Sequence, residues 1–159
     1  MIEIDETREV RAPAAVVWQV ITDFDRYPEW NPFVERCRSS LAPGDPIDMR
    51  VHVFEGFAQA QRETIFEHRP GERLVYGLAP ARLGALASRR VHEVTPQGDD
   101  ASRYRSHFVL SGWLSPLTGL LLGSRLERGF RAMTAALVAR AEALAAESRT
   151  PPRVEAARP

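Results

Sequence analysis

The chain has 159 residues, with 21 basic and 21 acidic side chains and a formal net charge of zero. This length fits one domain, and balanced charge gives no indication of a nucleic acid or an anionic membrane as partner. No lysine is present, which excludes Schiff-base lysines and P-loop lysines, and the lone Cys37 excludes an intrachain disulfide. The N-terminus lacks the basic and apolar regions of a signal peptide, so we expect a cytoplasmic protein without stable membrane insertion.

The first half of the chain predicts one strand, two short helices and a series of strands. Pro13 favours the start of a helix, because a proline at the first helical position loses no hydrogen bond. Apolar and polar residues alternate in most of the later segments, which is typical of strands with one wet face. The predicted helices cover 14–22 and about 24–27, and the predicted strands cover 2–11, 34–40, 47–54 and 57–67.

The second half predicts more strands and then one long helix. The strands lie near 74–78, 86–94 and 102–112, with turn residues about every ten positions, which indicates a meandering antiparallel sheet. From Pro116 to Glu147 apolar residues recur at steps of three and four, so we expect a helix of roughly 30 residues and about 45 Å. One domain over 1–147 and a disordered tail over 148–159 follow from this pattern.

This element order predicts an α+β domain with an internal pocket. A single helix covers a strip only about 10 Å wide, so it cannot fill the concave face of a curved sheet. The remaining space is either filled by side chains or left as a cavity for a ligand.

Several segments carry a family resemblance. The first runs through the aromatic motif Tyr27-Pro28-Glu29-Trp30-Asn31-Pro32-Phe33, and the others cover 66–76, 108–117 and 129–143. In this order they resemble the START-like, or SRPBCC, superfamily, in particular its polyketide cyclase/dehydrase-like branch. The resemblance implies a helix-grip fold, in which six or seven curved antiparallel strands wrap around the C-terminal helix, with two short helices after strand 1. It also implies a deep cavity for lipids, sterols, polyketides or other apolar ligands.

One departure from the family pattern concerns chemistry. Many relatives carry an acidic residue in the last strand before the Ser-Gly pair, where this chain reads Ser106-His107-Phe108-Val109. A catalytic role for such a carboxylate is therefore not carried over.

The candidate ligand-binding residues are aromatic and apolar side chains with one arginine among them. Trp18 is expected to pack in the core, while Trp30 and Phe33 either hold the helix-loop geometry or line the mouth of the cavity. The full set is Tyr27, Trp30, Phe33, Met49, Val51, Tyr76, Arg90, Tyr104, Phe108, Leu122, Leu126, Phe130 and Met133.

The phase of the predicted strand decides whether the two most consequential candidates face the interior or the solvent. Arg90 and His92 alternate with Val94, so both point inward if Val94 does. A buried arginine needs a partner, which could be Glu63, Glu93 or a carboxylate or enolate of the ligand. The alternative is that a bulge reverses the phase and leaves Arg90 on the surface.

Three functions remain open. We expect binding of a small hydrophobic or amphipathic ligand, with no cofactor, no metal and a homodimer allowed, because the four histidines do not cluster. The first alternative is a polyketide cyclase/dehydratase-like enzyme using Arg90, His92, Tyr76 and Tyr104. The second is a protein-interaction module, as in chaperone-activating relatives. Convergent desolvated ionisable groups would favour the enzyme, and a filled interior would favour the interaction module.

Overall fold

A computed structural model describes residues 1–54 and 56–149 of the chain. Its strands are β1 (Ile2–Val10), β2 (Val34–Ser39), β3 (Pro46–Phe54), β4 (Phe57–Arg69), β5 (Arg73–Gly77), β6 (Ala87–Pro96) and β7 (Ser102–Ser111). Its helices are α1 (Ala14–Thr22), α2 (Tyr27–Trp30) and α3 (Ser115–Arg149), with short 3₁₀ helices η1 (Phe24–Arg26) and η2 (Arg82–Gly84).

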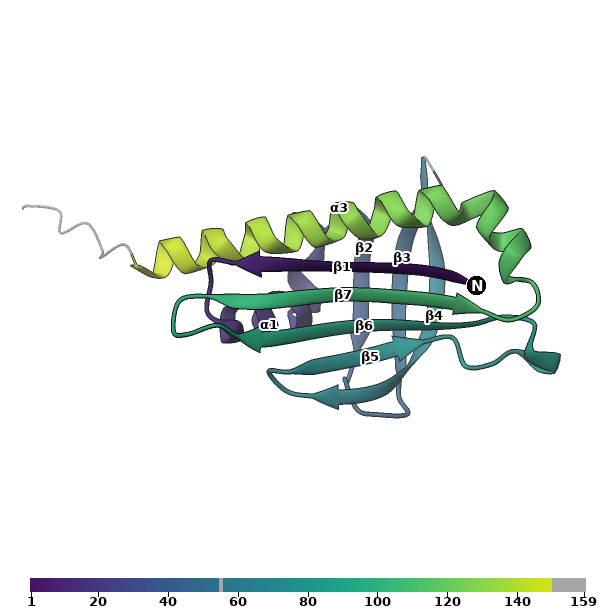
Figure 1. Ribbon diagram of the computed structural model, residues 1–159, viewed down its shortest axis with the longest axis horizontal. Helices are drawn as coiled ribbons and strands as arrows, with labels where there is room; N and C mark the ends of the chain where they lie inside the picture. Colours follow the sequence, from purple (N-terminus) through teal and green to yellow (C-terminus); the bar gives the residue numbers. More distant parts are fainter. Residues whose placement is uncertain (55, 150–159) are drawn as a thin grey trace, which may run out of the picture.

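The seven strands form one antiparallel sheet in the order β1-β7-β6-β5-β4-β3-β2, as the meander predicts. Register shifts interrupt the β2–β3, β3–β4 and β4–β5 pairings. Such bulges increase the local twist. As a result β2, β3 and β4 cross steeply behind β1, β7 and β6 in Figure 1, and the sheet curves around an interior.

The long helix α3 lies along this curved sheet and contacts β1, β3, β7 and α1 (Figure 1). Its inward face carries the buried residues Met133, Leu137, Ala141 and Ala145, spaced by four. The helix ends at Arg149, two residues beyond the predicted end, so the first two residues of the predicted tail are helical. The rest of that tail lies outside the described residues.

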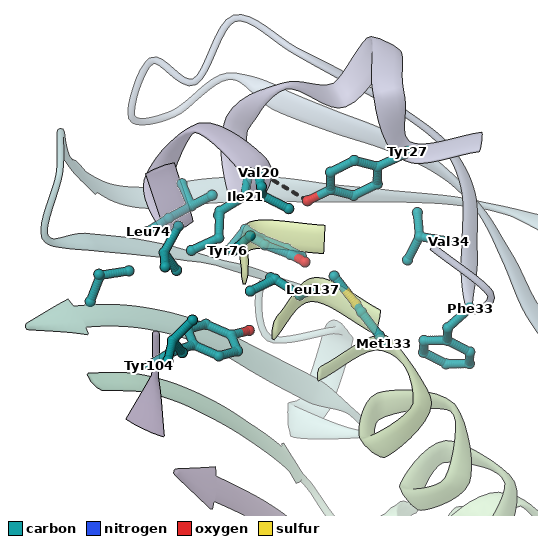
Figure 2. Close-up of a cluster of buried hydrophobic side chains, with 14 of the residues drawn as sticks. Val20, Ile21, Tyr27, Phe33, Val34, Leu74, Tyr76, Tyr104, Met133 and Leu137 are labelled. Atoms are coloured by element: carbon teal, nitrogen blue, oxygen red, sulfur yellow. Dashed lines mark hydrogen bonds between the residues drawn. The ribbon is translucent and has the colours of Figure 1, made fainter. Parts of the chain in front are cut away.

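Side chains from both ends of the chain form the core. Figure 2 shows Val20 and Ile21 of α1 and Met133 and Leu137 of α3 gathered near Tyr76 of the sheet. Fully burying one such aliphatic side chain contributes about 1.5–3 kcal/mol. The core therefore holds the two ends of the chain together around the sheet.

Three details differ from the sequence-based expectations. The second short helix is displaced: η1 occupies 24–26 and α2 follows at 27–30, because Pro28 suits a first helical turn. Tyr27, expected at the cavity rim, is buried in the core and donates a hydrogen bond to the Ile21 carbonyl at 2.7 Å (Figure 2). Trp18 packs against the core, but it is only half-buried, and its ring stacks on His68 at 5.9 Å.

Within the described residues, no helix combines the length and apolar character needed to span a membrane.

Candidate functional site

A small cavity of about 50 Å³, called the inner cavity below, lies between the sheet and α3. It is lined by Phe33, Val34, Met49, Val51, Val53, Gln61, Glu63, Tyr76, Arg90, Phe108, Leu126, Phe130 and Met133. The volume suits one or two water molecules and is far below the roughly 300 Å³ of a small ligand pocket. The expected cavity is thus in the expected place but is not deep.

Aromatic packing explains the small volume. The Phe130 ring on α3 lies 4.9 Å from the Phe33 ring and 4.6 Å from the Phe108 ring, measured between centroids. Three rings therefore occupy the space that one helix leaves open above a curved sheet.

Arg90 of β6 points into this apolar interior. The side chain is 1% exposed, and its three guanidinium nitrogens have no hydrogen-bond partner among the described residues. Its guanidinium carbon lies 4.4 Å from the centre of the Phe130 ring, a cation–π contact worth about 2 kcal/mol when desolvated. That is less than the several kcal/mol that desolvating a cation costs. Alternation along β6 also buries Ser88, His92 and Val94, so the inward phase is the one observed.

The two candidate carboxylates lie on opposite sides of the sheet. Glu63 of β4 lines the inner cavity with Arg90, whereas Glu93 faces outward and pairs with Arg73 and Arg105. Burial raises the pKa of the Glu63 carboxyl from 4.5 to about 7, while hydrogen bonds with Gln61 and Ser88 and the charge of Arg90 lower it. In the described part of the chain, no carboxylate forms an ion pair with Arg90.

A chain of hydrogen bonds runs behind Arg90. Tyr76 Oη lies 3.3 Å from Nε2 of His92, and Nδ1 of His92 lies 2.8 Å from Tyr104 Oη. Burial and the charge of Arg90 lower the pKa of His92, so the imidazole is neutral at pH 7. A neutral imidazole has one donor and one acceptor. One tyrosine hydroxyl therefore donates to the ring, and the other accepts from it and keeps its own proton for a further partner.

A surface groove of about 390 Å³, called the outer groove, adjoins the inner cavity. It is lined by Pro32, Phe33, His52, Val53, Phe54, Gly56, Arg125, Arg128, Gly129 and Ala132. Phe33 and Val53 line both spaces, so they form the partition between them. The Phe33 ring fits over Gly129 of α3, where a Cβ atom would overlap it.

A larger concavity lies elsewhere and is less suited to a ligand. A surface depression of about 740 Å³ lies near β2, β3 and β4; half of its lining residues are charged, and most of these charged side chains are exposed. Its Asp48 is paired with Arg62 at 2.6 Å, and both side chains are open to water. Perturbed, desolvated groups mark functional sites better than volume does. Across 1–54 and 56–149, no group of three or more His, Cys, Asp and Glu residues could hold a metal ion.

Most of the predicted ligand-binding residues meet at the inner cavity, although their role in binding stays a prediction. The residues on its wall are Phe33, Met49, Val51, Tyr76, Arg90, Phe108, Leu126, Phe130 and Met133. Four others do not line it. Tyr27 is in the core, Trp30 lines a separate surface pocket with Arg140, Tyr104 is linked to the cavity through His92, and Leu122 is half-buried on the first turns of α3.

Some lining residues escaped the sequence-based prediction, and Glu63 entered it only as a possible partner of Arg90. Gln61 and Glu63 alternate with the buried Ile65, and this period of two on β4 could have placed both inside. Val53 continues the inward-facing series of Met49 and Val51 on β3, so the same period of two could have placed it inside. No sequence signal identifies the contact between Gly129 and Phe33, since it joins segments nearly one hundred positions apart.

Comparison with solved structures finds this fold in several bacterial proteins. A START superfamily protein from Mycobacterium smegmatis has a TM-score of 0.69 and 20% identity, covering 89% of this chain and 98% of its own. The Zhui aromatase/cyclase from Streptomyces sp. R1128 has a TM-score of 0.69 and 18% identity, covering 88% and 93%. A protein from Thermobifida fusca has a TM-score of 0.66 and 27% identity, covering 91% and 95%.

No curated protein matches the chain. Residues 1–142 match the family described as polyketide cyclase / dehydrase and lipid transport, and because the match covers most of the chain, the chain belongs to this family.

Proposed function

We propose that the protein binds a small amphipathic molecule whose acidic or enolisable head contacts Arg90 and whose apolar body lies between the sheet and α3. The observation that carries this proposal is the buried guanidinium of Arg90, which faces the inner cavity without a hydrogen-bond partner among the described residues.

The charge of Arg90 indicates the chemistry of the head group. Guanidinium groups bind carboxylates and other oxyanions through paired, charge-assisted hydrogen bonds. An anionic oxygen at the cavity wall would offset the cost of burying the charge. Phe108, Phe130 and Met133 give the rest of the wall an apolar surface, which suits a hydrocarbon or aromatic body. The family's description, with its cyclases and lipid transport, supports a ligand of this class.

The ligand needs more room than the inner cavity has. Turning the Phe33 ring away from Gly129 would join the inner cavity to the outer groove. The combined space falls in the range of roughly 300–1,000 Å³ that small-molecule pockets occupy.

A second candidate function, polyketide cyclisation, is favoured by the Tyr76–His92–Tyr104 chain beside Arg90. In an aldol ring closure an α-carbon loses a proton, the enolate carbon bonds to a second carbonyl carbon, and that carbonyl oxygen gains the proton. The new hydroxyl group and a second hydrogen of the α-carbon then leave as water, and a carbon–carbon double bond forms. Arg90 would hold the enolate oxygen, and neutral His92 would accept and return the proton through Tyr76. The convergence of desolvated ionisable groups on one cavity favours the enzyme, whereas the nearly filled interior favours the interaction module unless Phe33 moves.

A pair of probes tests the role of Arg90. Anilinonaphthalene sulfonate carries an anion, and N-phenylnaphthylamine is its neutral relative. Arg90→Met should weaken binding of the sulfonate by about ten- to hundred-fold, the worth of a charged hydrogen bond, and leave the neutral probe within about two-fold. The matched control is Arg89→Met, because Arg89 is exposed on the other face of β6, over the Phe66 ring.

Fluorescence titration gives the affinities. Equal loss of both probes in Arg90→Met, or no loss of either, would contradict the proposal. A tetraketide thioester of N-acetylcysteamine separates the two functions. A product that is lighter by one water molecule, formed by the wild type but not by variants of Tyr76 or His92, indicates an enzyme. Binding of the thioester without a product indicates a binding protein.

A further inference from the structure

The exposed large apolar side chains of the described residues gather at one end of the molecule, called the apolar end below. They are Met1, Phe57, Leu83, Trp113, Leu117, Leu120 and Leu121. All are more than half exposed, and Leu83 and Leu120 reach 95% and 84%. Figure 1 shows the N-terminus, the start of α3 and the loop between β5 and β6 together on the right. Scattered single exposed apolar residues are normal, but a cluster of large ones marks an interaction surface.

The fold builds this end from segments far apart in sequence. The turn after β7 packs on the η2 loop: the Trp113 and Leu114 amides donate to the carbonyls of Gly84 and Ala85 at 3.4 and 3.1 Å. Gly112 permits this approach, because its φ is 109° and a Cβ atom there would overlap the Ala85 carbonyl. Leu83 itself adopts a left-handed φ of 60°.

Two further segments complete the apolar end. The β1–β7 pairing sets Ile2 opposite Leu110 and so brings Met1 to the same edge. At the β3–β4 hairpin, Phe57 stacks on Phe54, and the guanidinium of Arg125 on α3 lies 5.4 Å from the Phe54 ring.

Two long stretches of sequence around the apolar end lack acidic residues. No acidic residue stands between Glu72 and Glu93, or between Asp100 and Glu127, although the whole chain is neutral. Arg125 and Arg128 follow the exposed leucines along α3; both are exposed, and neither forms an ion pair within 1–54 and 56–149.

Two acids of the described residues lie near this end, and only Glu127 has an arginine as its counter-ion. Glu127 is paired with Arg131 at 2.8 Å, and Glu3 lies 3.0 Å from His107. Because His107 is charged only when protonated, Glu3 can offset one of the two unpaired arginines, and the net charge beside the apolar end stays positive.

We propose that the apolar end is a peripheral docking site for an anionic lipid bilayer. Trp113 and the leucines protrude rather than line a groove, which suits insertion among lipid head groups. Tryptophan is also enriched at the interface between membrane and water. Arg125 and Arg128 follow directly, where they would meet lipid phosphates. A second copy fits less well, because two such ends face to face would oppose arginine to arginine.

This docking is shallow and does not require the Arg90 site, although Arg125 and Arg128 also line the outer groove. The run from Leu110 to Ser124 carries no charge but is too short to cross a bilayer. The proposal stands whether or not Arg90 binds a ligand.

Co-sedimentation with sucrose-loaded vesicles tests the proposal on the full chain. The wild-type protein should bind vesicles of phosphatidylcholine containing phosphatidylglycerol, and bind pure phosphatidylcholine more weakly. Leu120→Glu with Leu121→Glu should lower the partition coefficient by about ten-fold or more. Ala135→Glu with Ala139→Glu is the matched control, because it adds the same charge to exposed positions of the same helix and should stay within about two-fold.

A second variant tests the charge. Arg125→Gln with Arg128→Gln should reduce binding to the mixed vesicles to the level seen with pure phosphatidylcholine. Absence of wild-type binding, or equal losses in the leucine and alanine variants, would overturn the proposal. So would a wild-type dimer in solution that the leucine variant dissociates, since the face would then be an interface between copies.

Discussion

Arg90 is a basic side chain and Glu63 an acidic one, and both lie in the buried interior. Each is buried, each lines the inner cavity, and they influence each other without an ion pair. A buried ion pair can be replaced by apolar residues at no loss of stability, so such groups are weak indications of stabilisation. Their arrangement is better explained by what they could bind. A neutral Glu63 would leave Arg90 free for an anionic head group, whereas an ionised Glu63 would compete with it.

The Glu63 carboxyl should make stability depend on pH. Its folded pKa of about 7 is above the ordinary 4.5, so the folded state binds the proton more tightly than the unfolded state. The contribution of Glu63 to stability is then full below pH 4.5, falls as the pH rises toward 7 and is lost above it. The loss is roughly 3 kcal/mol at about 1.4 kcal/mol per pH unit. Glu63→Gln should remove it, so its stability relative to wild type should grow by about that amount from pH 5 to pH 8.

Urea denaturation at several pH values measures this difference. Glu9→Gln is the control, since Glu9 is exposed and its pair with Arg103 lies on the surface. A difference between Glu63→Gln and wild type that stays constant with pH would contradict the prediction. Binding of anilinonaphthalene sulfonate should weaken over the same pH range in the wild type and not in the variant.

At the scale of elements, the junction of α3 with the loop after α2 controls access to the interior. Phe33 closes the inner cavity by packing against Phe130 and over the bare backbone of Gly129. Glycine inside a helix costs about 1 kcal/mol relative to alanine. The helix is therefore less stable at Gly129 than it would be with alanine, but the methyl group of alanine would displace the Phe33 ring.

Two glycine variants of α3 separate helix propensity from this packing. Gly123→Ala has open space around the new methyl group and should stabilise the protein by up to about 1 kcal/mol. Gly129→Ala must displace Phe33, so it should be less stable than Gly123→Ala and should bind anilinonaphthalene sulfonate faster, because the partition is opened. Stopped-flow fluorescence gives the rates and urea denaturation the stabilities. Identical behaviour of the two variants would show that Phe33 is not the partition.

At the scale of the whole molecule, the outer face of the sheet is tied together by ion pairs. Arg105 of β7 lies 2.6 Å from Asp5 of β1 and 3.2 Å from Glu93 of β6. Glu93 also pairs with Arg73 of β5, which lies 3.3 Å from Glu67 of β4. The network therefore crosses five neighbouring strands. Isolated surface pairs contribute little, but a shared carboxylate couples several of them.

Glu93→Gln removes the centre of this network. It should lower the free energy of unfolding by about 1 kcal/mol in dilute buffer, and by less at about 1 M salt, where the Debye length is near 3 Å. Asp48→Asn, which breaks the exposed pair with Arg62 alone, is the reference and should cost less. Equal effects of both substitutions at low salt would count against coupling across the strands.

The fold could be predicted from the sequence because its signals are local. Period-two alternation marked the strands, period-3.6 spacing marked α3, and proline and glycine marked the turns. The order of these elements then left few topologies open. The displaced second helix shows the limit of local signals. Pro28 is compatible with the position after a helix that ends at Tyr27, and equally with the first turn of a helix that begins there.

The sequence by itself determined the element order, the family resemblance and the residue types available to the interior. The tertiary structure alone decided which face of β6 is buried, that Glu63 rather than Glu93 shares the cavity with Arg90, and that three phenylalanines nearly fill it. It also brought Leu83 beside the start of α3 to form the apolar end. The physical reason is that strand phase, side-chain packing and the meeting of distant loops depend on contacts between segments, which no local pattern of residues encodes.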